Sequence, residues 1–205
     1  MQEICERQGV PDGPVLYGKE RNRFDINQGD IGDCWFLAAL ANLADNEQAL
    51  ARVVPGGQGF GAEQYIGAFR FCFYRFHITY LIDYLVFNAA MPRFGCWYEV
   101  VVDDLLPTRN NKLLYLKAEE PNEFWTPLLE KAYAKFYGSY QALESGTAIE
   151  SAVDFTGGIP EYIDISEDIQ TQDVQEIFVN LLRAYESHNF LSCSMAVCSM
   201  YVWML

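Results

Sequence analysis

Gly32-Asp33-Cys34-Trp35-Phe36-Leu37-Ala38-Ala39-Leu40-Ala41 is the stretch of the chain that decides the fold class. After Cys34 the residues form an unbroken apolar run without a polar stripe, which predicts a helix buried on all sides. We expect this helix to be the centre of the fold. Gly32 indicates a loop just before it, so Cys34 lies at the amino end of the helix, where backbone N–H groups and the helix dipole stabilise a thiolate.

A second chemical group, Gln28, lies six residues upstream of Cys34 in a loop that contains Gly29 and Gly32. Such a loop can fold back so that the Gln28 amide and the Cys34 backbone N–H face one developing oxyanion. A thiolate beside two such donors is an arrangement suited to acyl transfer. The alternative is that Cys34 is a small core residue, as cysteines in apolar helices commonly are.

The rest of the chain predicts an α+β fold that is mostly helical around the central helix, with a small antiparallel sheet. Period-two alternation predicts two strands, with a third candidate segment, at residues 69–76, 96–102 and 113–116. Helical spacing predicts three further helices at residues 123–136, 149–155 and 174–185. Residues 190–205 are strand-like and apolar up to the last position.

Polar residues predict where several of these helices begin. Asn46 or Asp45 can cap a second helix through Leu50 and Arg52, and Asn122 can cap the helix at 123–136. Capping boxes are expected at the last two helices, formed by Thr147 with Glu150 and by Asp173 with Glu176.

Composition excludes several classes of protein. A net charge of −14 makes a nucleic-acid partner improbable, because phosphate binding needs a basic surface, whereas cations suit this surface. The six cysteines are widely and irregularly spaced, which predicts reduced thiols. Residues 1–10 lack the apolar core of a secretory signal, and the most apolar windows, 78–91 and 190–205, are shorter than a membrane helix requires. These features predict a cytoplasmic protein without a membrane span.

The string Asp25-Ile26-Asn27-Gln28-Gly29-Asp30-Ile31-Gly32-Asp33-Cys34-Trp35 resembles the active-site signature of the calpain family. Further segments resemble calpain segments in calpain order over about residues 15–162, with one interruption; they are residues 98–104, 106–108, 123–125, 129–135 and 154–158. The resemblance implies a calcium-dependent, papain-like cysteine endopeptidase with protein substrates. It implies that this chain is the first of the two lobes of such a protease.

The resemblance also implies roles for individual residues. Cys34 is then the nucleophile, Gln28 the oxyanion-hole donor, and Trp35 a residue that packs beside the substrate cleft. Gly146 lies where the family presents its backbone to the substrate strand, although Ser145 replaces the Gly that usually precedes it. The alternatives are core packing for Trp35 and loop flexibility for Gly146.

A calcium site and a contact between the lobes follow from the same resemblance. The implied calcium ligands are the carboxylates of Asp25 and Glu123 and backbone carbonyls near Tyr17 and Gly18, an oxygen-rich set that suits a hard cation. Arg23 lies where the family forms a salt bridge between its lobes. The alternative for Glu123 is an acidic residue in the first turn of a helix, where it favours the helix dipole.

The expected domain organisation is an extended segment at 1–24, a protease lobe at 25–189 and the truncated start of a second lobe at 190–205. Within the lobe, residues 77–94 are an atypical insert, and their removal would rejoin two strands across a turn. Because the family pattern is lost abruptly here and at 196–205, we hypothesise a retained intron or alternative splicing at both places. The alternative for the insert is a short inserted helix, which residues 78–91 could form.

The only two histidines of the chain, His77 and His188, do not suit the role of catalytic base. His77 lies in the insert, and His188 is expected at the solvated end of a helix. The resemblance implies that the catalytic His and Asn come from the second lobe, with further regulatory domains as possible partners. The chain alone is therefore expected to be inactive, and the alternative is a noncatalytic module that binds calcium or a protein partner.

Overall fold

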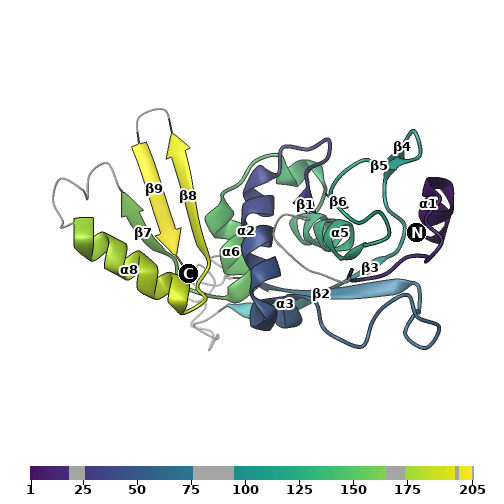
Figure 1. Ribbon diagram of the computed structural model, residues 1–205, viewed down its shortest axis with the longest axis horizontal. Helices are drawn as coiled ribbons and strands as arrows, with labels where there is room; N and C mark the ends of the chain where they lie inside the picture. Colours follow the sequence, from purple (N-terminus) through teal and green to yellow (C-terminus); the bar gives the residue numbers. More distant parts are fainter. Residues whose placement is uncertain (19–25, 76–94, 165–173, 197–198, 205) are drawn as a thin grey trace, which may run out of the picture.

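The structure is a computed structural model that describes residues 1–18, 26–75, 95–164, 174–196 and 199–204. Two helices, α2 (Cys34–Asp45) and α6 (Ala148–Thr156), run side by side through its middle (Figure 1). On one flank lie α5 (Trp125–Tyr137) and the amino terminus, and on the other lies a sheet with a covering helix. The molecule is thus arranged around α2, the helix that the apolar run predicts. The helix is not buried on all sides as predicted, because Leu37, Ala38 and Ala41 are only half-buried.

The first sheet is a two-stranded antiparallel ribbon formed by β2 (Ala68–Arg75) and β3 (Cys96–Asp103). Its register runs from Ala68 opposite Asp103 to Arg75 opposite Cys96, so the ends that flank the insert at 77–94 face each other. Helices α5, α6 and α3 (Glu47–Val53) pack against this ribbon. The two predicted strands are therefore confirmed.

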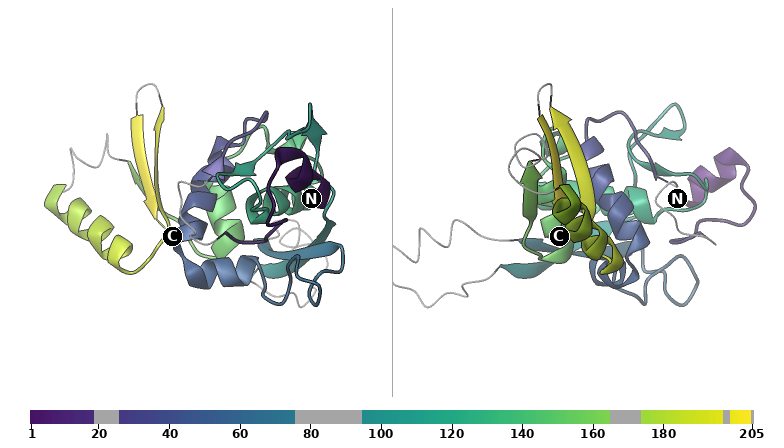
Figure 2. Two further views of the ribbon diagram at one scale, coloured as in Figure 1. Left: turned by 45° about the vertical axis from the view of Figure 1, so that its right-hand side comes forward. Right: turned by 60° about the vertical axis from the view of Figure 1, so that its left-hand side comes forward.

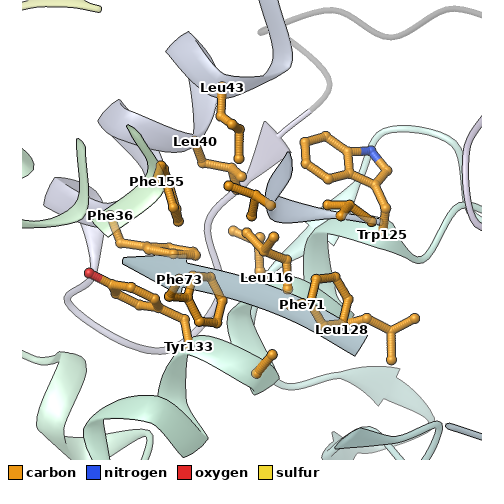
Figure 3. Close-up of a cluster of buried hydrophobic side chains, with 14 of the residues drawn as sticks. Phe36, Leu40, Leu43, Phe71, Phe73, Leu116, Trp125, Leu128, Tyr133 and Phe155 are labelled. Carbon is orange, nitrogen blue, oxygen red and sulfur yellow. The ribbon is translucent and has the colours of Figure 1, made fainter. Parts of the chain in front are cut away.

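The core lies where α2, α5, α6 and β2 meet (Figure 3). Phe36 of α2 stacks on Tyr133 of α5, with ring centroids 4.7 Å apart, and Phe73 and Phe155 pack around the same tyrosine. All four side chains are fully buried. Burial of large rings contributes roughly 1.5–3 kcal/mol each, so this cluster fixes how the helices cross.

The last part of the chain forms a three-stranded antiparallel sheet in the order β7-β9-β8, with α8 (Val174–Glu186) beside it (Figures 1 and 2). Its strands are β7 (Glu161–Asp164), β8 (Leu191–Ala196) and β9 (Ser199–Met204). The strand-like character predicted for residues 190–205 is confirmed within the described residues. Asn42 of α2 accepts a hydrogen bond from the Leu191 amide at 3.1 Å, which joins this sheet to the central helix.

Short elements complete the fold: α1 (Gln2–Gln8), β1 (Ile26–Asn27) paired with β6 (Lys117–Ala118), β4 (Thr108–Arg109) paired with β5 (Lys112–Leu113), and the 3-10 turn η1 (Gln141–Leu143). Together these features confirm the α+β class and the papain-like first lobe. Helix α8 begins at Val174, as expected, but Asp173 of its predicted capping box lies outside the described residues.

Three local predictions are wrong. The segment 1–24 does not start extended but with α1, whose buried Cys5 anchors it to the core. Residues 113–116 do not add a strand to the β2–β3 ribbon, because only Leu113 of this segment lies in a strand, where it pairs with Thr108 in a separate small hairpin. Asn122 does not cap α5: the cap position is Phe124, and the Asn122 amide donates to the Gly13 carbonyl instead.

Two caps are confirmed. The Asn46 side chain accepts from the Ala49 amide at 2.9 Å at the start of α3. Thr147 and Glu150 form the reciprocal capping box of α6. The five cysteines in the described part of the chain are free thiols, in agreement with the predicted reduced state. No helix among the described residues has the length and apolar character needed to cross a membrane.

Candidate active site

Cys34 is the first residue of α2 and its side chain is exposed, while Trp35 and Phe36 behind it are buried. The backbone carbonyl of Asp33 accepts the first helical hydrogen bonds, from Phe36 at 2.9 Å and Leu37 at 3.1 Å. The structure therefore places a solvent-accessible thiol at the amino end of a buried helix. Because Cys34 is exposed, the alternative of a core cysteine is contradicted.

The loop before Cys34 is held against residues 114–118. Ile26 and Asn27 pair with Ala118 and Lys117, and the Asp30 amide donates to the Leu114 carbonyl at 3.0 Å. A Cβ on Gly29 would overlap the Tyr115 backbone, so only glycine permits this close approach. The loop geometry is thus set by a segment that is remote in sequence.

Gln28 turns back within this loop toward the helix start. Its Nε2 donates to the Ile31 carbonyl at 2.8 Å and to Asp33 Oδ1 at 3.3 Å. An amide nitrogen carries two hydrogens, so both are engaged in this conformation. One of these bonds must break before the amide can donate to an oxyanion.

Asp33, next to the thiol, faces another buried carboxyl group, Glu130 of α5. Their side chains are 0% and 1% exposed, and Glu130 Oε2 accepts from the Leu116 amide at 3.0 Å. Burial, followed by the charge of Asp33, raises the pKa of Glu130 to about 9. Burial also raises the pKa of Asp33, and its hydrogen bonds to Glu130 and Gln28 oppose that rise. A carboxyl pair therefore lies at the end of the loop at residues 26–33 that leads into Cys34.

Trp35 is 8% exposed and packs mainly into the core. Its Nε1 donates to the Leu143 carbonyl at 2.9 Å, and its ring contacts those of Phe36, Tyr133 and Tyr137. A Cβ on Gly146 would lie 2.5 Å from Trp35 Cε2, so the Gly146 backbone lies directly against the indole. The structure thus brings Trp35 and Gly146 together beside Cys34.

A third buried carboxyl group supports this region from α6. Asp154 Oδ2 accepts from the hydroxyls of Tyr133 at 2.8 Å and Tyr137 at 2.7 Å. Burial raises the pKa of Asp154 to about 6, while the two hydroxyl donors act in the opposite direction. This cluster joins α5 to α6 behind the Trp35 ring.

The predicted calcium ligands are only partly within the described residues. Residues 15–16 lie against 122–125 through backbone hydrogen bonds, and Glu123 Oε1 accepts from the Gly18 amide at 2.8 Å. Glu123 is 3% exposed, and the Glu120 carboxylate also approaches Gly18. Tyr17, Gly18 and Glu123 therefore come together, whereas Asp25 and Arg23 lie outside the described residues.

The donor set only partly fits calcium. Two carboxylates near Gly18 suit a hard cation, but Glu123 accepts the Gly18 N–H, and an N–H is not a calcium ligand. Among the residues that the structure describes, no group of three or more His, Cys, Asp or Glu side chains could hold a metal.

His188 follows α8 in a left-handed conformation with φ 57°, and it is exposed. Its carbonyl accepts from Asn46 at 3.0 Å, just beyond the carboxyl end of α2. Cys34 is at the opposite end of this 12-residue helix, roughly 18 Å away at the helical rise of about 1.5 Å per residue. His188 is therefore too far away to serve as the base for Cys34, and His77 lies outside the described residues.

Three functional candidates were missed by reasoning from the sequence: Glu130, Asp154 and Glu120. The sequence does contain a signal that Glu130 is buried. It lies among Leu128, Leu129 and Ala132 on the face of α5 that the apolar spacing predicts to be buried. An acidic residue on a buried face needs a partner, but the sequence does not reveal which one.

The chain matches the family described as "Calpain family cysteine protease" over residues 1–83 and 83–201. These two stretches meet inside the segment 77–94. The chain is 41% identical over 186 residues to Calpain-B of Drosophila melanogaster, covering 91% of this chain and 18% of that protein. It is 44% identical over 175 residues to Calpain-8 of Mus musculus, covering 85% of this chain and 22% of that protein.

This chain therefore spans about a fifth of the length of the curated relatives it matches. The family match covers nearly all of it, and the described fold, with an exposed cysteine at the start of a buried helix, agrees with that match. The chain belongs to the calpain family of cysteine proteases.

Proposed function

We propose that this chain is the cysteine-bearing part of a calcium-dependent endopeptidase in which Cys34 is the nucleophile and Gln28 the oxyanion donor. The observation that carries the proposal is the exposed Cys34 thiol at the amino end of a buried helix. That position stabilises a thiolate, which can attack a peptide carbonyl carbon. The tetrahedral oxyanion is then stabilised by the Cys34 backbone N–H and by the Gln28 amide once it is released from one of its present acceptors.

Gly146 is proposed to present its backbone to the substrate, with the buried Trp35 ring as its support. This pairing is supported by the contact that a Cβ at position 146 would make with the indole. A proton acceptor for Cys34 is proposed to come from a second lobe with a His and an Asn, because His188 is at the far end of α2. The chain alone is then expected not to hydrolyse peptides.

The nucleophile is tested in a chimera in which this chain replaces the matching part of mouse Calpain-8. We expect calcium-dependent cleavage of casein that Cys34→Ala abolishes, and a rate about 100- to 1,000-fold lower in Gln28→Ala. Cleavage that survives Cys34→Ala would contradict the proposal. In the chain itself, iodoacetamide should modify Cys34 faster than Cys96, which is also exposed and serves as an internal reference.

Calcium binding is proposed to involve Glu123 together with Asp25. The proposal is supported by the convergence of the Glu123 and Glu120 carboxylates at Gly18. These carboxylates would hold the ion, and its positive charge would offset theirs. Calorimetric titration should show binding to the chain that is lost in Glu123→Gln and in Asp25→Asn but kept in Glu63→Gln, an exposed control.

A noncatalytic role is the second candidate, and it is favoured by the distance of His188 from Cys34. In that case the chain binds calcium or a protein partner without cleaving it. Calcium binding by the chain together with an inactive chimera would support this role, whereas an active chimera would exclude it.

A further inference from the structure

Two buried carboxyl oxygen atoms near the loop at residues 26–33 have no hydrogen-bond donor in the described part of the chain. They are Asp33 Oδ2 and Glu130 Oε1. The other oxygen of each group is engaged, since Asp33 Oδ1 accepts from Gln28 and Glu130 Oε2 accepts from the Leu116 amide. Buried acceptors normally have a hydrogen-bond partner, and a carboxyl group can supply one only when it carries a proton.

The two carboxyl groups are near enough to form a hydrogen bond with each other once one of them is protonated. With both groups ionised, two negative charges would face each other away from water, which is strongly unfavourable. With one proton shared, a hydrogen bond between the two groups replaces this repulsion. We place the proton on Glu130, because Asp33 lies at the amino end of α2, where the helix dipole favours a negative charge, and accepts from the Gln28 amide.

The other titratable groups around the pair do not replace this proton. The Tyr140 ring lies near Glu130, and Tyr115 stacks on Tyr140 with centroids 4.1 Å apart. Burial and the neighbouring Glu130 charge raise the pKa of Tyr140, so it stays neutral when the carboxyl pair titrates. Cys34 follows Asp33 directly but is exposed to solvent.

We propose that Asp33 and Glu130 share one proton and act as a positioning pair that holds the Gln28 amide beside Cys34. Ionised Asp33 accepts from Gln28, and protonated Glu130 donates to Asp33, so α5 fixes the orientation of the proposed oxyanion donor. The role of Gln28 rests on the proposed function, but the shared proton does not. Loss of the pair would release Gln28 without removing any group that touches a substrate.

The shared proton is tested with Glu130→Gln, measured by equilibrium unfolding in denaturant from pH 5 to pH 9. Folding of the wild-type chain takes up this proton, because the pKa of Glu130 is raised from about 4.3 in the unfolded chain to about 9 in the fold. The wild-type chain therefore loses stability as the pH rises from 5 to 9, and its equilibrium constant for unfolding increases by up to about tenfold per pH unit. In Glu130→Gln this contribution should vanish, since the new amide donates to Asp33 without titrating.

The matched control is Glu63→Gln, which removes an exposed carboxyl group and should keep the wild-type pH dependence. The hydrogen bond between Gln28 and Asp33 is measured separately, by the NMR signals of the Gln28 side-chain amide at pH 7. We expect these signals to be kept in Glu130→Gln and to shift in Asp33→Ala. If Asp33→Ala does not fold, Asp33→Asn serves instead, and there the pH dependence assigned to Glu130 should decrease.

Two results would overturn the proposal. One is a Glu130→Gln chain whose unfolding keeps the wild-type pH dependence. The other is a Gln28 amide whose signals do not shift in Asp33→Ala or, where Asp33→Asn is used instead, a pH dependence that does not decrease. Neither readout needs catalysis, and both should be unchanged in Cys34→Ala. A chimera that cleaves casein without Cys34 would therefore refute the proposed function while the shared proton still stands.

Discussion

Gly146→Ala is the substitution whose effect the structure defines most directly. The new Cβ would lie 2.5, 2.6 and 2.8 Å from Trp35 Cε2, Cζ2 and Cδ2. Carbon atoms in contact are normally about 3.5–4.0 Å apart, so the indole or the backbone at position 146 must move by about 1 Å. The indole has little room, because the rings of Phe36, Tyr133 and Tyr137 contact it.

The magnitude follows from these contacts. A shift of about 1 Å away from Leu143 would break the 2.9 Å bond from Trp35 Nε1, a loss of about 1 kcal/mol. Overpacking adds about 1–3 kcal/mol, so the free energy of unfolding should fall by about 2–4 kcal/mol. For a chain of this size, that lowers the melting temperature by about 4–16 °C.

The assay is urea unfolding followed by far-UV circular dichroism, with Gly56→Ala as the matched control. A Cβ at Gly56 meets no atom within 4 Å, so this variant should be neutral or slightly stabilising. If Gly146→Ala unfolds within about 0.5 kcal/mol of Gly56→Ala, the contact between Gly146 and Trp35 is not the constraint we describe. In the chimera, Gly146→Ala should also lower the rate of casein cleavage.

Three further predictions concern the surroundings of the site. Thr147→Ala should lower the free energy of unfolding by about 1 kcal/mol through loss of the α6 cap, measured by denaturant unfolding, and an unchanged value would contradict the cap. The carboxyl group of Asp154 should titrate near pH 6 by carbon NMR, and its contribution to stability should be lost as the pH rises from about 4 through 6. Tyr137→Phe removes a donor to this carboxylate and should raise the pKa of Asp154 further, so a lower pKa in the variant would refute the assignment. Lys131→Met should raise the lowered pKa of Asp103 toward its ordinary value, and an NMR titration midpoint that does not move would show that the 2.5 Å ion pair is absent in solution.

Much of the fold was predictable from local patterns. The apolar run after Cys34 predicts the buried helix α2, and alternation predicts β2 and β3, since each pattern reflects the periodicity of a single element. The capping box of Thr147 and Glu150 is likewise a local signal. Two of the three wrong predictions fall where a tertiary contact overrides a local signal. Asn122 bonds to Gly13 rather than capping α5, and residues 114–116 bind Asp30 and Glu130 rather than a sheet.

In the candidate site, too, local patterns were predictable and tertiary contacts were not. The sequence identifies Cys34 and Gln28, because both lie in one short loop that leads into one helix. It does not reveal the support beneath them, since Glu130 is nearly a hundred residues further along the chain.

The amino-acid sequence by itself determined the family, the central helix and the position of Cys34 at its amino end, because these depend on short motifs in order along the chain and on a local apolar run. That Cys34 is exposed rather than a core residue was decided by the structure. Only the tertiary structure decided that Gly146 lies against Trp35, that His188 is at the wrong end of α2 and that Asp33 faces Glu130. Such contacts join segments that are far apart in the chain, and their geometry is set by how the buried rings of α2, α5 and α6 pack.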